Sequence, residues 1–80
     1  KPHIHIKLFA SLRKYLPESP ETYPVEPGTS IKRLIEQLGI PVKDVKLVFI
    51  NSVKSSLSSC LQGGETVGLF PPVGVDNRAL

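Results

Sequence analysis

The stretch QGGETVGLFPPV, residues 62–73, contains a turn, a strand and a stop signal in immediate succession. Its adjacent glycines are typical of a tight turn between strands, because glycine adopts positive φ angles without steric cost. The run Thr66–Phe70 contains several β-forming residues. The two prolines then end the strand, because proline has no N–H group to donate to a sheet. We therefore predict a turn at 62–65 and a final strand at Thr66–Phe70.

Residues 3–9 carry the strongest strand signal in the chain, an alternation of side chains with period two. Successive side chains of a strand point to opposite faces, so this strand has one apolar face and one mixed face. The apolar face consists of Ile4, Ile6 and Leu8, and the other of His3, His5, Lys7 and Phe9.

Two weaker segments follow the first strand. Residues 10–16 favour a short helical turn, which the next proline stops. The residues expected to share one side of this turn are Leu12, Tyr15 and Leu16. Residues 21–26 are a weak strand candidate interrupted by Pro24, which suits an edge strand. The first two strands would form a hairpin with a long connection.

The best helix signal covers Ile31–Leu38, where apolar residues recur with helical spacing. Ser30 or Thr29 can cap the first free N–H groups, and Gly39 offers the left-handed C-terminal cap. Pro41 prevents continuation. A helix of this length cannot bury its apolar stripe alone, so we expect it to lie across a sheet.

The second half of the chain completes the sheet. Residues 42–46 are ambiguous, Leu47–Ile50 is a β-type run, and 51–60 has room for a turn and a short strand near Val53. The element order predicts an α+β fold, a mixed sheet of four or five strands with one main helix packed across one face. The sheet residues expected beneath the helix are Ile4, Ile6, Leu8, Val48, Ile50, Val67 and Leu69.

Length and composition exclude several classes. Eighty residues suffice for one small domain, and 40% hydrophobic with 21% charged residues is ordinary globular usage. No apolar run approaches the ~20 residues that span a bilayer, so no membrane partner is expected. The single cysteine, Cys60, excludes an internal disulfide framework and favours a reducing cytoplasm.

The net charge of +3 only weakly favours anionic partners. Basic residues are spread along the chain, and aromatic residues make up only 6%, so we expect no nucleic-acid partner.

By strand alternation, Phe9, Phe49 and Phe70 all point away from the helix-covered face. If their strands are neighbours, the rings form an exposed patch that could dock a partner protein. The alternative is that each ring is half-buried under a loop or the tail.

No residues predict catalysis, a metal site or a cofactor. His3 and His5 share a strand face, but no third ligand is evident nearby, so we interpret them as exposed histidines. Cys60 lacks a partner cysteine or an obvious base, and we expect a half-buried structural thiol.

The order and spacing of these segments resemble the small sulfur carriers of the MoaD/ThiS family, which have the ubiquitin-like β-grasp fold. Residues 62–73 are similar to the family's DGDEVxxFPPV pattern. The double proline is closer to the small subunit of molybdopterin synthase than to the thiamine carriers. Supporting pieces are KLFASLR at 7–13, the helix Ile31–Leu38, and Ile50-Asn51, which is similar to the family's VN.

The resemblance implies a non-enzymatic carrier in cofactor biosynthesis, with a β-grasp domain at 1–73 and a flexible tail at 74–80. A partner enzyme would adenylate the terminal carboxylate, and sulfur would then replace AMP. The implied partners are an adenylating activating enzyme or a large synthase subunit, which Phe9 and Phe70 would face. The implied tail site is Pro71, Pro72, Val73 and Gly74.

The chain departs from the family pattern after Val73. Val75 and Asp76 stand where family members have two glycines, so the sequence predicts impaired sulfur transfer. Lys54 occupies a contact position that is usually apolar in the family. A second interpretation therefore stays open, a ubiquitin-like interaction module that has lost sulfur transfer and binds another protein.

Overall fold

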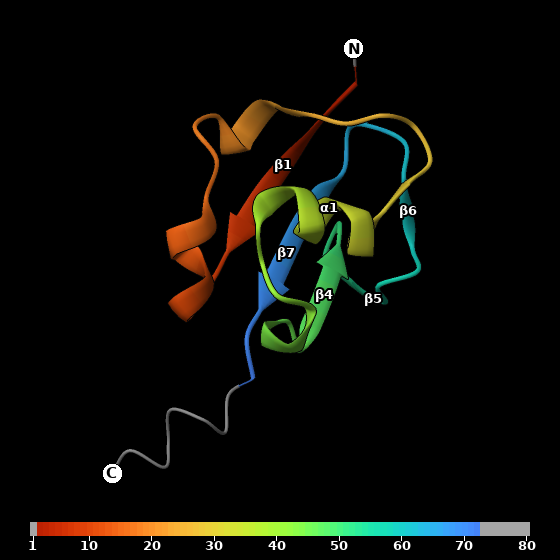
Figure 1. Cartoon of the computed structure of the whole chain (residues 1–80). Coiled ribbons are helices and arrows are strands. Elements are labelled where there is room, and N and C mark those ends of the chain that lie inside the picture. Colours follow the sequence, from red (N-terminus) through yellow and green to blue (C-terminus); the bar gives the residue numbers. More distant parts are fainter. Residues whose placement is uncertain (1, 73–80) are drawn as a thin grey trace, which may run out of the picture.

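The computed structural model describes residues 2–72, and its centre is a five-stranded sheet (Figure 1). The central strands β1 and β7 are parallel, whereas the other neighbours pair antiparallel. The predicted mixed sheet is therefore confirmed. In sheet order, the strands are β2 (Tyr23–Pro24), β1 (His3–Leu8), β7 (Thr66–Phe70), β4 (Leu47–Ile50) and β5 (Val53–Ser55).

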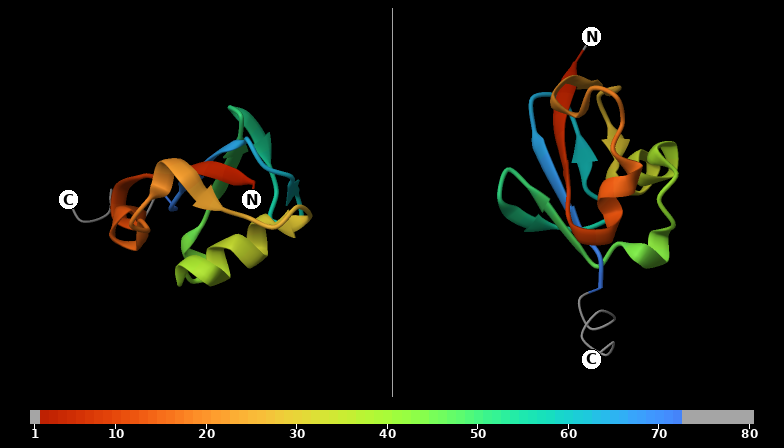
Figure 2. Two further views of the ribbon diagram at one scale, coloured as in Figure 1. Left: turned by 90° about the horizontal axis from the view of Figure 1, so that it is seen from above. Right: turned by 90° about the vertical axis from the view of Figure 1, so that its left-hand side faces the viewer.

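The helix α1 (Ile31–Leu38) has the predicted bounds and lies on one side of the sheet (Figure 2). The Ser30 hydroxyl accepts a hydrogen bond from the Arg33 N–H at 3.1 Å and so caps the first turn. Gly39 follows the helix with a φ of 82°, a left-handed conformation that costs glycine least. Both predicted caps are confirmed.

The hydrophobic core lies between α1 and the inward face of the sheet. Ile4, Ile6 and Leu8 of β1 are each no more than 5% exposed, as their alternation predicted. At about 1.5–3 kcal/mol for each buried aliphatic side chain, this layer is the main source of stability. The other buried members of the predicted face are Val48, Val67 and Leu69, whereas Ile50 is half-buried against them.

The turn at 62–65 fixes the start of β7 beside β1. Gly63 and Gly64 have φ angles of 122° and 89°, as predicted for a glycine turn. A Cβ at Gly63 would lie 2.5 Å from the Cβ of Pro2, so this position requires glycine. The Gly64 N–H donates to the His3 carbonyl at 2.6 Å, which joins the turn to the first strand.

Glu65 closes the same turn with its side chain. The carboxylate accepts hydrogen bonds from the backbone N–H groups of Gln62 at 2.9 Å and Gly63 at 2.8 Å. Partial burial raises the pKa of Glu65, but these bonds and one from its own N–H outweigh that effect. The pKa therefore lies below its ordinary value, and the turn is stabilised by the ionised carboxylate.

The strand predicted at 21–26 is mostly wrong. A 3₁₀ helix, η2 (Pro20–Thr22), occupies its first part, and only β2 pairs with β1. Pro24 lies on an edge strand, as predicted, where its missing N–H breaks no ladder. The opening hairpin is confirmed in this shortened form.

The predicted helical turn at 10–16 is a 3₁₀ helix, η1 (Ala10–Tyr15). Leu12 is buried, but Leu16 is 40% exposed. A 3₁₀ helix has three residues per turn rather than 3.6, and Leu16 lies beyond its last residue. The expected shared side therefore holds for Leu12 and Tyr15, which packs against the core, and is wrong for Leu16.

A second, two-stranded sheet pairs β3 (Thr29–Ser30) with β6 (Cys60–Leu61). Leu61 is fully buried, so strand alternation turns its neighbour Cys60 toward solvent. The expectation of a half-buried thiol at Cys60 is therefore wrong. The ambiguous segment 42–46 contains the 3₁₀ helix η3 (Val42–Asp44).

The described residues leave one part of the predicted organisation untested. The boundary at residue 73 and the tail 74–80 lie outside them and stay predictions. Over the range 2–72, no helix combines the length and apolar character needed to cross a membrane.

Candidate docking surface

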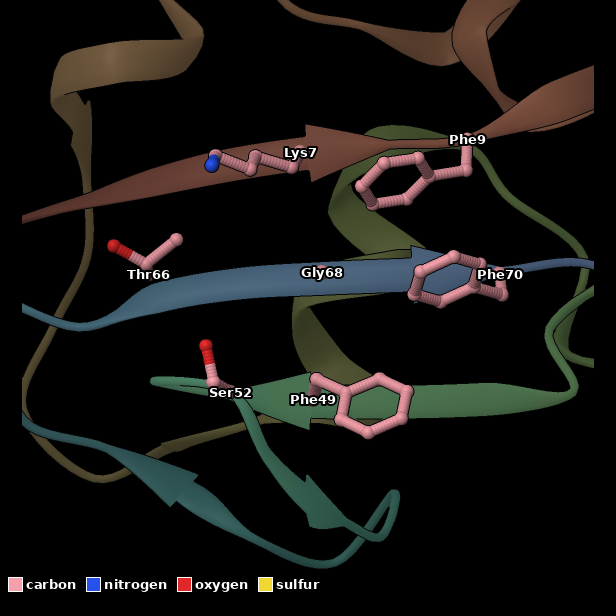
Figure 3. A pocket seen from close by; sticks show the side chains of 7 residues that line it. All are labelled: Lys7, Phe9, Phe49, Ser52, Thr66, Gly68 and Phe70. Atoms are coloured by element: carbon pink, nitrogen blue, oxygen red, sulfur yellow. The ribbon is translucent and has the colours of Figure 1, made fainter.

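Three aromatic rings gather on the outer face of the sheet, opposite α1 (Figure 3). The Phe9 and Phe70 rings stack with their centroids 4.2 Å apart and their planes within 3°. The Phe49 ring meets that of Phe70 edge-on, with centroids 5.6 Å apart. Such ring pairs contribute about 0.5–1.5 kcal/mol beyond their burial. We refer to Phe9, Phe49 and Phe70 as the aromatic cluster.

Strand register explains why these rings meet. Phe49 lies opposite Gly68 in the antiparallel β4–β7 pair, and Phe70 follows two residues later on the same face. The Phe9 N–H donates to the Leu69 carbonyl at 3.2 Å, which holds Phe9 beside the end of β7. The rings therefore point outward as alternation predicted, whereas their role in docking stays a prediction.

The aromatic cluster borders an open depression of about 350 Å³. Gly68 forms the floor, where a Cβ would lie 3.6 Å from the Phe9 ring and 3.9 Å from the Phe70 ring. These are ordinary van der Waals distances, so the absent side chain leaves usable space without relieving a clash. The lining residues are Lys7, Phe9, Phe49, Ser52, Thr66, Gly68 and Phe70.

The cluster is neither fully exposed nor fully buried, and the predicted cover by the tail lies outside the described residues. Phe9 is 37% exposed, while Phe49 and Phe70 are half-buried. The rings cover part of one another through their stacked and edge-on contacts. The cluster is thus packed on itself and still offers apolar surface to a partner.

The cluster lies where β7 ends. Because β1 and β7 are parallel, their last residues reach the same edge of the sheet (Figure 1). The Lys46 N–H donates to the Phe70 carbonyl at 2.7 Å, so β7 remains hydrogen-bonded to its last residue. Of the predicted tail site, Pro71 is buried, Pro72 is half-buried, and Val73 and Gly74 lie outside the described residues.

A hairpin turn at Asn51 and Ser52 borders the depression from β4. Both residues have positive φ, 52° and 69°, as in two-residue turns that join antiparallel strands. The Asn51 Oδ1 accepts the Thr66 N–H at 2.9 Å, and the Asn51 N–H donates to the Thr66 carbonyl at 2.8 Å. This role of Asn51 was not predicted from the sequence, although the tolerance of asparagine for left-handed backbone could have indicated it.

Positive side chains flank the depression. Lys7 lines it from β1, and Lys54 lies opposite Phe49 on β5, and both lysines are exposed. His3 and His5 lie further back along β1 on the same face. In the part of the chain that the structure describes, no three His, Cys, Asp or Glu side chains are grouped to hold a metal ion. The outer face of the sheet thus presents both apolar and positively charged groups to a partner protein.

Comparisons with known proteins match this architecture. The family model described as Mut7-C ubiquitin matches residues 1–74. A putative molybdopterin converting factor subunit 1 from Pyrococcus furiosus is 25% identical, with a TM-score of 0.67 over 91% of this chain and 100% of that one. A small archaeal modifier protein 1 from Haloferax volcanii is 20% identical, with a TM-score of 0.65 over the same two shares. A search among curated protein sequences found no match.

These matches identify the fold. The sheet order β2-β1-β7-β4-β5, with α1 across one face, is the ubiquitin-like β-grasp arrangement that the resemblance implied. The family match includes the glycine turn, the final strand and both prolines. The chain therefore belongs to the Mut7-C ubiquitin family and shares its ubiquitin-like fold with a molybdopterin converting factor subunit.

Proposed function

We propose that this protein is a non-enzymatic, ubiquitin-like docking protein of the sulfur-carrier type. The aromatic cluster binds a partner protein, either an adenylating activating enzyme or the large subunit of a synthase in molybdopterin-like cofactor biosynthesis. The segment Pro71, Pro72, Val73 and Gly74 leads the end of the chain toward the partner's reaction site. The observation that carries this proposal is the partly exposed aromatic cluster beside the end of β7.

The placement of the cluster supports docking. Aromatic side chains are enriched among the residues that dominate binding energy at protein interfaces. These three come from β4, β7 and the residue after β1, whose backbones are hydrogen-bonded in the sheet centre. The rings are therefore already ordered, and little conformational entropy is lost when a partner covers them.

The solved relatives support the carrier role. One is described as a putative molybdopterin converting factor subunit and another as a small archaeal modifier protein. In a carrier, the terminal carboxylate attacks the α-phosphate of ATP and pyrophosphate leaves. A sulfur nucleophile then displaces AMP from the acyl group, which leaves a thiocarboxylate.

A second candidate function is protein binding without sulfur transfer. Val75 and Asp76 favour it, because they stand where the MoaD/ThiS pattern has two glycines. Glycine lets surrounding backbone approach closely, whereas a branched side chain and a carboxylate hinder entry into a narrow site. This candidate uses the same aromatic cluster.

Intact-mass spectrometry separates the two candidates. The chain is incubated with ATP, a sulfur donor and an activating enzyme that adenylates carriers of the MoaD/ThiS family. A mass increase equal to the exchange of one oxygen for sulfur supports the carrier. An unchanged mass, together with retained binding of the enzyme, supports the interaction module.

Binding measurements test the docking surface itself. Phe9→Ala and Phe70→Ala are each expected to weaken binding of the activating enzyme by about tenfold or more. Leu16→Ala is the matched control, because Leu16 is an apolar residue 40% exposed outside the cluster, and it keeps the wild-type affinity. Wild-type affinity in both folded phenylalanine variants would overturn the proposed docking surface.

A further inference from the structure

Lysine, glycine and aromatic residues form one row across the outer face. Lys7 pairs with Gly68, and Gly68 pairs with Phe49 on its other side. Phe49 in turn pairs with Lys54. Because neighbouring strands lie about 4.8 Å apart, the backbones of the two lysines are roughly 14 Å apart. A lysine therefore lies at each end of the row. Between them lie Gly68, which forms the floor of the depression, and Phe49, whose ring lines it.

Among residues 2–72, no outward strand position carries an acidic side chain. The titratable side chains at outward strand positions are His3, His5, Lys7 and Lys54. Across residues 2–72, neither lysine takes part in an ion pair. Unneutralised charge of one sign attracts a partner of the opposite sign and disfavours others.

We propose that the outer face selects an acidic protein partner, which inserts one apolar side chain over Gly68 and places carboxylates beside Lys7 and Lys54. This inference rests on the proposed docking function and adds the chemistry of the partner. A glycine inside a strand often marks a close approach by another molecule, and here it opens a depression of about 350 Å³ between aromatic walls. One large apolar side chain fits this space.

Two other occupants suit the face less well. A second copy packed symmetrically would set the lysines of one chain against those of the other. Single-stranded nucleic acid needs open ring faces for base stacking, whereas Phe9 and Phe70 already stack on each other. Charge and ring geometry therefore favour an acidic protein segment.

Selection from a random peptide library displayed on phage tests this chemistry with the full chain as bait. The selected peptides are expected to carry one aromatic or large aliphatic residue with Asp or Glu on both sides. Peptides that survive are then mapped by amide chemical shifts, which should change at Lys7, Gly68 and Lys54. Enrichment of basic peptides, or no enrichment of acidic apolar ones over the starting library, overturns the inference.

Charge and shape variants are titrated against the winning peptide. Lys7→Glu combined with Lys54→Glu should weaken binding about tenfold or more, and should favour the same peptide with its acids changed to lysine. Raising the salt concentration should weaken the wild-type complex. Lys32→Glu on α1, an exposed lysine away from the outer face, is the control and keeps the wild-type affinity.

Substitutions of Gly68 test whether the partner's side chain enters the depression, without any change of charge. Gly68→Val should fill the depression and weaken binding of the peptide by about tenfold. Gly68→Ala is the milder second variant, because its Cβ meets neighbours only at ordinary contact distances, and it should weaken binding by a smaller factor. If a folded Gly68 variant binds the peptide with unchanged affinity, the proposed insertion of an apolar side chain over Gly68 is overturned.

Failure of this inference is distinguishable from failure of the proposed function. If Phe70→Ala weakens binding of the activating enzyme but the lysine and glycine variants bind every probe normally, docking stands and the acidic partner is overturned. If Phe70→Ala has no effect, the docking surface fails as well. Self-association of the wild-type chain through this face, or tighter binding of a single-stranded RNA oligonucleotide than of the peptide, also overturns the inference.

Discussion

The two faces of the sheet come from the same strands and differ in what they contact. On β1, Ile6 is 2% exposed beneath the helix, whereas the next residue, Lys7, is exposed on the outer face. On β7, Leu69 is fully buried and its neighbour Phe70 stacks on Phe9 at the surface. Because alternation assigns successive residues to opposite faces, one strand can serve stability and recognition with different side chains.

The comparison predicts the largest loss of stability at Leu69. Leu69→Ala removes a fully buried side chain and leaves a cavity that the packed core cannot refill. We expect the free energy of unfolding to fall by about 2–5 kcal/mol, measured by urea denaturation. A loss below about 1 kcal/mol would show that the inner face is not the main source of stability.

Phe70→Ala on the adjacent position should have a smaller effect. It removes one stacked and one edge-on ring contact, and we expect the free energy of unfolding to fall by about 1–2 kcal/mol. The same urea titration, run beside Leu69→Ala, provides the comparison. Equal destabilisation by both variants would mean that the outer rings belong to the core, and the contrast between the faces would not hold.

The next largest loss of stability is expected at the hairpin turn of Asn51 and Ser52. Asn51→Gly keeps the freedom needed for a φ of 52° but loses the side-chain hydrogen bond to Thr66. We expect a loss of about 1 kcal/mol in unfolding free energy, and a larger loss for Asn51→Ala, which also strains the backbone. Wild-type stability in Asn51→Gly would show that the Asn51 side chain does not stabilise the turn.

The smallest expected effect is at Glu65 and depends on pH. The pKa of Glu65 is lower in the folded chain, so its stabilisation is fully present above the ordinary glutamate pKa of about 4.5. This contribution is lost as the pH falls through the lower, folded-state pKa. Glu65→Gln should therefore melt below the wild type at neutral pH, and the two melting temperatures should converge in acid. Melting curves that keep a constant separation from neutral to acidic pH would contradict this assignment.

The elements that could be predicted from the sequence are those whose patterns are local and long enough to repeat. The period of residues 3–9 identified β1 and its buried face, and the spacing from Ile31 to Leu38 identified α1. Ser30 and Gly39 acted as caps because capping depends on a few neighbouring backbone groups. Each of these signals lies within one segment of the chain.

Elements that depend on distant partners were missed. The two-residue strands β3 and β6 have no period of their own and exist because Ser30 pairs with Cys60 and Thr29 with Leu61. That pairing buries Leu61 and exposes Cys60, so the thiol was placed wrongly. The same limit applied to segment 21–26, where a 3₁₀ helix that begins at Pro20 replaced the first two residues and only Tyr23–Pro24 formed a strand.

The candidate site was predicted in part for the same reason. Alternation alone placed Phe9, Phe49 and Phe70 on the outer face. The row from Lys7 through Gly68 to Lys54 could not be predicted, because it depends on how β1, β7 and the β4–β5 hairpin, which lie apart in the sequence, pair with one another. A glycine within a strand gives no sign of its surroundings until those neighbours are known.

The first and last strands of the described chain are neighbours at the centre of the sheet, with Leu8 beside Leu69. During synthesis, β1 therefore emerges with its isoleucines uncovered. Its parallel partner β7 is made only after nearly all of the remaining domain. Contacts of such sequence separation slow folding, because a long loop must close before they form. The sheet is thus completed only after β7 has left the ribosome, and a nascent chain halted earlier exposes an apolar strand to chaperones.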